Sequence, residues 1–408
     1  MVAPSGARKG DTVSLAVINI GLSHSGDPAG TPLAGDALVC RDGVIAWIGA
    51  SDEVVAEQHD QVVDARGAGV VPGLIDTHVH TTFGDYTPRQ NTVGFLESYV
   101  HGGVTSAISA SEVHVPGRPT DVEGVKALAI AAQRAYQDYR PGGMRVYGGS
   151  VILEPGLTYD DFAFLREQGV WLAKGGFGAF GSPMDYVPLV HDARRAGITV
   201  TVHTGGGSIP GTLEKMDAAA LIAMNPHVAF HASGGPTAMA PEDNELLVRE
   251  GEMALQLVMA GNLRSSLDMC RLARTHGQEH RILIASDTPT GTGVVPLALW
   301  HLSAELVSLG GLTWQQAVSA MTGRAAEVFG LDSGRLEVGR PADLLVLDAP
   351  LGSAGETWAG ALEVGDVPGV CVAITDGVLR FTRSRNTPAA RRAAAVTGAG
   401  APVAPAGH

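Results

Sequence analysis

The sequence contains little cysteine and lacks any long hydrophobic run. Its three cysteines, Cys40, Cys270 and Cys371, lie far apart and form no CxxC or CxH spacing. They suggest neither a disulfide framework nor a cysteine metal site, so we expect reduced core thiols in a cytoplasmic protein. No run approaches the roughly 18 apolar residues of a membrane helix. The N-terminal stretch "MVAPSGARKGDTVSLAVINIG" does not read as a secretory signal.

Positive charge is also scarce. The 408 residues include 28 Lys and Arg against 42 Asp and Glu, which gives a net charge of −14. This balance argues against nucleic acid or an anionic membrane as a partner and favours a small molecule. With 45% hydrophobic and 17% charged residues, the composition excludes a disordered chain and a coiled coil. The length allows a large barrel of about 250 residues and a second, smaller domain.

Both ends of the chain have the pattern of short antiparallel strands. Residues 12–70 contain alternating segments broken by turns, such as "DALVCRDGVIAWIG", and the same texture returns in "RLEVGRPADLLVLDAP" and "PGVCVAITDGVLRFTRS". We predict that residues 1–70 and 335–386 form one small β-sandwich domain, with the middle of the chain inserted between them. Residues 387–408 are rich in Ala, Gly and Pro, and we expect a disordered tail there.

Residues 71–334 instead alternate strand-like and helix-like segments. Amphipathic stretches such as "VEGVKALAIAAQRAYQDY" and "SSLDMCRLARTHG" separate eight short apolar runs. Eight alternations favour a closed (β/α)8 TIM-like barrel over an open sheet. The predicted strands are "GLID", "VTSAIS", "MRVYGGSVIL", "VWLAKG", "ITVTVHT", "HVAFHA", "MALQLVM" and "ILIASDT".

The first of these strands ends in two histidines separated by one residue. Side chains alternate faces along a strand, so His78 and His80 point the same way. Catalytic groups of such a barrel gather at the carboxyl ends of its strands. Single polar residues stand at the matching places of four other strands. We predict a metal site there, with zinc as the default because imidazole suits zinc, iron and nickel. The other predicted ligands are Lys174, His203, His231 and Asp287.

Lys174 does not fit a simple cation site, because an ammonium group repels metal ions and is costly to bury. In one interpretation, the methylene chain of Lys174 is buried while its ammonium group pairs with a carboxylate. In the other, its amine has reacted with carbon dioxide to form a carbamate, an anion whose two oxygens bridge two cations as a glutamate would.

Three rival functions have weaker support. The stretch "GFGAFG" at 176–181 matches GxGxxG, but the next strand ends in His203 where a dinucleotide fold needs an acid. No GxSxG elbow of a serine hydrolase occurs. A relative that keeps the scaffold without catalysis would lack the ligands, and all six positions are filled.

Taken together, "GLIDTHVH", the lysine of the fourth strand, the single histidines after the fifth and sixth, the aspartate after the eighth and "GRPADLLVLD" resemble the amidohydrolase superfamily over nearly the whole chain. The stretches "FGDYTPRQ", "HTGGGSIPG", "SGGPTAM" and "SDTPTGTG" are similar to its enamidase branch. That branch hydrolyses the cyclic enamide 1,4,5,6-tetrahydro-6-oxonicotinate. The same superfamily includes a competing class of cyclic amidases that act on dihydropyrimidines, hydantoins or dihydroorotate.

The resemblance implies roles for the predicted residues. His78 and His80 would hold one divalent ion, His203 and His231 the other, and a carboxylated Lys174 would bridge them. One ion would be zinc and the other zinc or iron. A hydroxide shared by the ions would attack the ring carbonyl, and Asp287, also a ligand, would carry its proton to the leaving nitrogen. The chain departs from the enamidase pattern at Lys174, where that branch carries a glutamate.

A second set of residues is expected to recognise the substrate. Three residues follow the first two barrel strands on the catalytic face and are candidates for binding a substrate carboxylate. The resemblance also implies a homotetramer. The three candidates are Arg89, His114 and Arg118.

Overall fold

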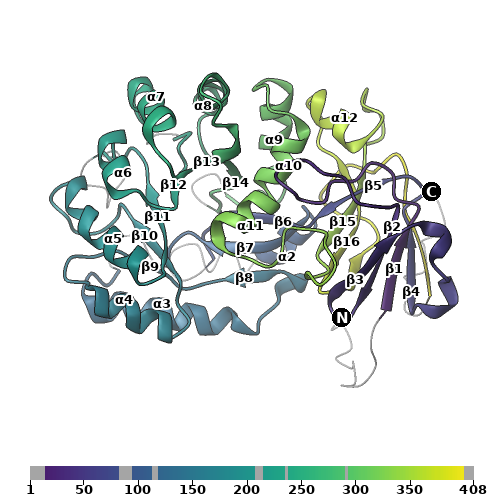
Figure 1. Cartoon of the computed structure of the whole chain (residues 1–408), viewed down its shortest axis with the longest axis horizontal. Helices are drawn as coiled ribbons and strands as arrows, with labels where there is room; N and C mark the ends of the chain where they lie inside the picture. Colours follow the sequence, from purple (N-terminus) through teal and green to yellow (C-terminus); the bar gives the residue numbers. More distant parts are fainter. Residues whose placement is uncertain are drawn as a thin grey trace.

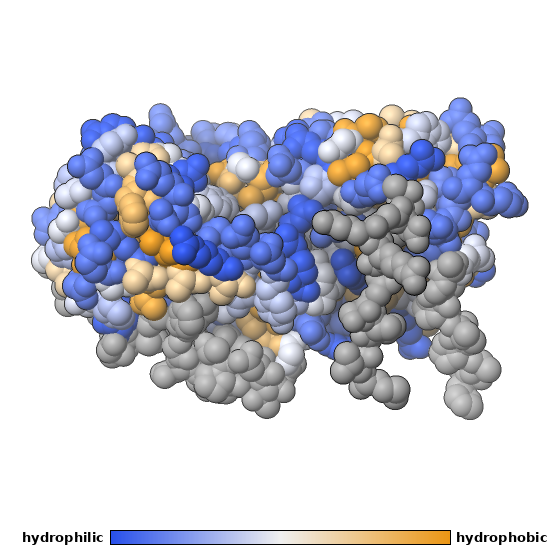
Figure 2. All heavy atoms as spheres, turned by 90° about the horizontal axis from the view of Figure 1, so that it is seen from below, coloured by the Kyte–Doolittle hydropathy of each residue, from blue (hydrophilic) through white to orange (hydrophobic). Residues whose placement is uncertain are grey.

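The computed structural model describes residues 14–81, 94–112, 118–206, 215–234, 238–289 and 293–398. Figure 1 shows a barrel with its surrounding helices on the left and a β-rich part on the right. On the face seen in Figure 2, hydrophilic residues dominate and hydrophobic ones form separate small groups. None of the helices in the described part of the chain is long and apolar enough to cross a membrane.

The barrel strands occur where the sequence predicts them. One sheet has the order β14-β13-β12-β11-β10-β9 and the other β6-β7-β8. All pairs within both sheets are parallel, and their residues are almost entirely buried. The strands are β6 (Leu74–Val79), β7 (Val104–Ser109), β8 (Arg145–Tyr147), β9 (Ser150–Ile152), β10 (Leu172–Gly175), β11 (Thr199–His203), β12 (Val228–Phe230), β13 (Ala254–Val258) and β14 (Ile282–Ala285).

Backbone contacts between the first and last strands join the two sheets. The amide of Asp287 donates to the carbonyl of His78 at 3.0 Å, and the amide of His80 donates to the carbonyl of Thr288 at 3.1 Å. The third predicted strand is divided into β8 and β9 by two glycines. Gly149 has φ +96°, a conformation that L side chains rarely adopt, so the strand breaks here.

Helices connect successive strands and cover the outside of the barrel (Figure 1). Side-chain caps fix several of their starts: Asp121 accepts from the amide of Gly124, and Asn262 accepts from that of Ser265. The α-helices are α2 (Phe95–Val100), α3 (Val122–Gln137), α4 (Tyr159–Glu167), α5 (Val187–Arg195), α6 (Ala218–Met224), α7 (Pro241–Glu250), α8 (Leu263–Thr275), α9 (Ala298–Ser308), α10 (Trp314–Ala320), α11 (Gly323–Phe329) and α12 (Trp358–Glu363); the 3-10 turns are η1 (Ser51–Glu53), η2 (Ala56–Gln58), η3 (Pro141–Gly143), η4 (Pro183–Tyr186) and η5 (Glu279–Arg281).

The two ends of the chain meet in a pair of sheets of order β18-β4-β1-β2-β3 and β17-β16-β15-β5. Purple N-terminal and yellow C-terminal strands lie side by side in Figure 1. One apolar core contains residues of both sheets, among them Leu15, Leu38, Val70 and Val346, which makes this part a sandwich. Its strands are β1 (Ser14–Ile18), β2 (Ala37–Arg41), β3 (Val44–Gly49), β4 (Gln61–Asp64), β5 (Gly69–Pro72), β15 (Leu344–Asp348), β16 (Gly369–Thr375), β17 (Val378–Phe381) and β18 (Ala395–Gly398).

The expected disorder from residue 387 onward is wrong for residues 387–398. The strand β18 pairs antiparallel with β4, and Arg392 donates to both oxygens of the buried Asp348 at 2.7 and 2.8 Å. A free sheet edge and a buried carboxylate supply partners that the local composition does not reveal. Residues 399–408 lie outside the described residues. All three cysteines are buried and free, as expected.

Candidate active site

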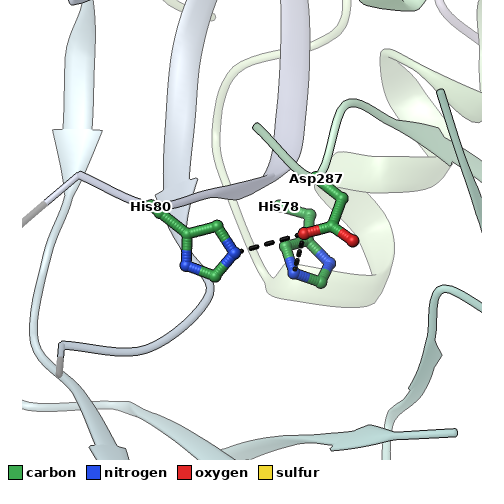
Figure 3. Close-up of side chains that lie close together, drawn as sticks. All are labelled: His78, His80 and Asp287. Carbon is green, nitrogen blue, oxygen red and sulfur yellow. Dashed lines mark hydrogen bonds and ion pairs between the residues drawn. The ribbon is translucent and has the colours of Figure 1, made fainter. Parts of the chain in front are cut away.

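The two histidines at the end of β6 converge as predicted. Nε2 of His78 lies 3.1 Å from Oδ1 of Asp287, and Nε2 of His80 lies 3.2 Å from the same oxygen. Figure 3 shows both rings directed at this carboxylate. These three residues form a group that could hold a metal ion, with ligand atoms within 4.8 Å of one another.

Asp287 is positioned by the contacts that close the barrel. Its φ of +55° lies in the left-handed region, which aspartate tolerates better than most residues but which still costs free energy. The neighbouring Ser286 donates its amide to Asp76 at 3.0 Å and its hydroxyl to the carbonyl of His78 at 3.2 Å. These contacts keep the carboxylate of Asp287 facing the two imidazoles.

His203, the last residue of β11, and His231, directly after β12, bring two further imidazoles to the same end of the barrel. Their ring centroids are 4.3 Å apart, and those of His78 and His231 are 5.6 Å apart. Among the described residues, neither ring nitrogen of His203 nor Nδ1 of His231 has a hydrogen-bond partner. Buried polar atoms normally have one, so these nitrogens fit a cation as their missing partner.

Burial keeps the imidazoles neutral. It lowers the pKa of His78 to about 4 and that of His231 to about 3, and it holds the pKa of His203 well below the usual value. Neutral imidazole is the form that binds metal ions.

Lys174 lies in β10 and is only 2% exposed. Its Nζ is 4.2 Å from the ring centroid of Phe230 and 5.7 Å from that of Phe177. Within the described part of the chain, it forms no ion pair with a carboxylate, so the interpretation of a head paired with an acid has no support there. Burial lowers the pKa of Lys174 to about 7, while the charge of Asp287 opposes this shift.

Of the three candidates for substrate binding, the structure describes only Arg118. Arg89 and His114 lie outside the described residues. The guanidinium of Arg118 pairs with the buried Glu154 and donates to the carbonyls of Phe177 and Pro119. The structure thus gives Arg118 protein partners, and its contact with substrate stays a prediction.

The chain matches the model of the amidohydrolase family over residues 70–377. It belongs to the amidohydrolase family. The enamidase of Eubacterium barkeri is 41% identical over 93% of this chain and 98% of its own length. A crystal structure of enamidase superposes with a TM-score of 0.89 at 41% identity and covers 94% of this chain and 100% of that one. This likeness confirms the predicted barrel with its β-rich domain.

Relatives of lower identity are named for other reactions. An imidazolonepropionase of Acidiphilium cryptum (strain JF-5) is 25% identical over 80% of this chain and 90% of its own length. A dihydroorotase of Brevibacillus brevis is 24% identical, with coverage of 71% and 80%.

In this amidohydrolase, other side chains surround the six predicted residues, and the sequence patterns did not predict them. Gln256 on β13 contacts Nδ1 of His78 at 2.7 Å. The ring of Phe230 lies 4.1 Å from that of His78, and the ring of Phe177 lies 4.7 Å from that of His203. A usable signal existed only for Gln256, which is the single polar residue in the apolar strand "ALQLV". The two phenylalanines look like ordinary core residues.

Proposed function

We propose that this amidohydrolase hydrolyses the C–N bond of a cyclic enamide, 1,4,5,6-tetrahydro-6-oxonicotinate, to 2-formylglutarate and ammonium. The main support is the 41% identity to an enamidase, which spans almost the full length of both chains. The imidazolonepropionase and the dihydroorotase above are only 25% and 24% identical. We therefore assign the substrate of the enamidase to this chain. The reaction class, hydrolysis of a cyclic amide, agrees with the family.

We assign two divalent ions to the six converging residues. The group of His78, His80 and Asp287 would hold one ion, and His203 with His231 would hold the other. The unpartnered buried nitrogens of His203 support this assignment. Zinc is the expected metal, with iron as the alternative at one site. Such ions polarise a carbonyl oxygen and lower the pKa of bound water towards about 7.

Lys174 would complete the site as a carbamate between the two pairs of histidines. The carbamate forms when the neutral amine attacks carbon dioxide, with a new N–C bond and the release of one proton. Its burial among aromatic rings without a carboxylate partner in the described residues supports this modification, because an unpaired ammonium there is unfavourable. A carbamate also restores the negative group that a glutamate provides in the enamidase pattern.

Side chains of the protein itself would transfer the protons of the reaction. Asp287 lies beside His78 and His80 and would take a proton from the attacking water and give it to the departing nitrogen. That transfer avoids the expulsion of an amide anion. The released enamine would tautomerise to an imine, and addition of a second water to the imine would release ammonium and leave the aldehyde. Phe177 and Phe230 form apolar walls beside Lys174.

The deciding experiment measures ammonium released from 1,4,5,6-tetrahydro-6-oxonicotinate by zinc-loaded protein. Dihydrouracil, hydantoin and dihydroorotate are assayed for ring opening in parallel. We expect rapid ammonium release from the first compound alone. Opening of another ring without ammonium release from the first would move the substrate to the competing cyclic amidases and retain the metal centre.

Assembly and location extend the proposal. We expect a cytoplasmic homotetramer that acts on a small molecule and binds neither nucleic acid nor membrane. Light scattering coupled to size exclusion would test the tetramer directly.

A further inference from the structure

Gln256 is a fully buried amide in the interior of the barrel. It lies in the middle of β13, whose other residues are Ala254, Leu255, Leu257 and Val258. A buried amide is unfavourable unless its hydrogen bonds are made. Its partners therefore indicate why this strand carries a polar residue.

Both ends of the Gln256 amide contact β6. Its Oε1 lies 2.7 Å from Nδ1 of His78, and its Nε2 donates to the hydroxyl of Thr77 at 2.8 Å. The backbone amide of His231 also donates to Oε1, at 3.5 Å, and this group can only be a donor. An amide oxygen cannot donate, so the proton of the neutral His78 ring must lie on Nδ1.

This contact determines which ring nitrogen of His78 is available to bind a metal ion. With the proton on Nδ1, the lone pair of His78 lies on Nε2, which faces Oδ1 of Asp287 at 3.1 Å. Two acceptor atoms at that distance repel each other unless a cation or proton lies between them. In the other tautomer, Nε2 would carry the proton and donate it to Asp287. Nε2 would then have no free lone pair with which to bind a metal ion.

We propose that Gln256 is a positioning residue that fixes His78 in the tautomer able to bind the first metal ion. Gln256 also contacts one member of the second pair of histidines, because its Oε1 accepts from the backbone amide of His231 at 3.5 Å. One residue thus orients ligands from both pairs. The inference rests on the proposed metal centre but is independent of which ring the enzyme opens.

The test measures metal affinity directly. Metal-free wild-type protein and variants are titrated with Co²⁺ in competition with a chelator, and the visible absorption of bound cobalt reports occupancy. We expect Gln256→Met, which keeps the volume but removes the acceptor, to bind the first ion about 10–100-fold more weakly. Gln256→Glu retains an acceptor for Nδ1 and should restore affinity.

Leu257→Ala is the matched control. Leu257 is the next residue of β13, is equally buried and belongs to the main apolar core. Side chains alternate along a strand, so Leu257 faces away from Gln256 and His78. It should lower the thermal unfolding temperature of the metal-free protein without changing Co²⁺ affinity. Unchanged affinity in Gln256→Met, or an equal loss in Gln256→Met and Gln256→Glu, would overturn the positioning role.

The two proposals fail in different ways. If wild-type protein binds no Co²⁺, both the proposed metal centre and the proposed role of Gln256 are wrong. If the affinities follow the expected order while no ammonium is released from the enamide, the substrate is wrong and the role of Gln256 stands.

Discussion

The guanidinium of Arg118 forms an ion pair with Glu154, a carboxylate that is completely buried. The second oxygen of Glu154 accepts from the amide of Ala179 at 2.7 Å, and Arg118 donates to the carbonyl of Phe177. The pair therefore braces the loop after β10, whose Phe177 ring packs against Lys174 and His203. The same loop contains the "GFGAFG" motif, and its first two glycines allow close packing: a Cβ on Gly176 would lie 2.5 Å from Cβ of His203, and one on Gly178 would lie 2.2 Å from the carbonyl oxygen of Leu153.

Substitution of Glu154 should destabilise the whole fold. Glu154→Gln leaves the charge of Arg118 buried without a counter-charge, and removal of one partner of a buried pair typically costs about 3–5 kcal/mol. Urea denaturation of the metal-free protein would measure this loss in the free energy of unfolding. Asp192→Asn is the control, because Asp192 pairs with the 65% exposed side chain of Arg195; it should change stability by less than about 1 kcal/mol. Equal effects of the two substitutions would contradict the bracing role.

Replacement of Lys174 tests the bridging carbamate. Lys174→Ala should lower bound metal and abolish turnover, because the site loses its central anion. Short carboxylic acids added to this variant should restore part of both, and Lys174→Glu should restore metal without bicarbonate. Metal analysis and ammonium release are the measurements. Full metal and full activity in Lys174→Ala would rule out the bridge.

The sequence predicts the polar residues of the site better than their surroundings, for a physical reason. His78 and His80 share a face because of the two-residue period of a strand, and the barrel brings the other predicted residues to the same end. The partner of His78 is Gln256, which is 178 residues away in the chain. No local periodicity encodes such a contact, and the pairing of β18 with β4 was missed for the same reason.

Asp287→Asn separates metal binding from proton transfer. The amide keeps an oxygen that can face the two histidines but cannot accept and release a proton. We expect substantial bound metal and a fall in turnover of about 10²–10⁴-fold, the usual size of general acid–base catalysis. Metal content and the rate of ammonium release should be measured on the same preparation. A variant that retains most of its rate would remove Asp287 as the proton carrier.

The stability of the fold should decline in mild acid because of His227, at the opposite end of β12 from the candidate active site. Nδ1 of His227 accepts from the amide of Val200 at 3.0 Å, so protonation breaks this bond. Burial and the nearby Arg194 lower the pKa of His227 from 6.5 to about 4.

The unfolded chain therefore binds more protons than the folded one between these two values. Stability is retained above pH 6.5 and is lost as the pH falls towards 4, by about 2 kcal/mol after allowance for partial exposure of the ring. His227→Gln removes the titrating group, so its unfolding free energy relative to wild type should rise by that amount between pH 7.5 and pH 4.5. A constant difference between the two proteins across this range would show that His227 does not titrate with folding.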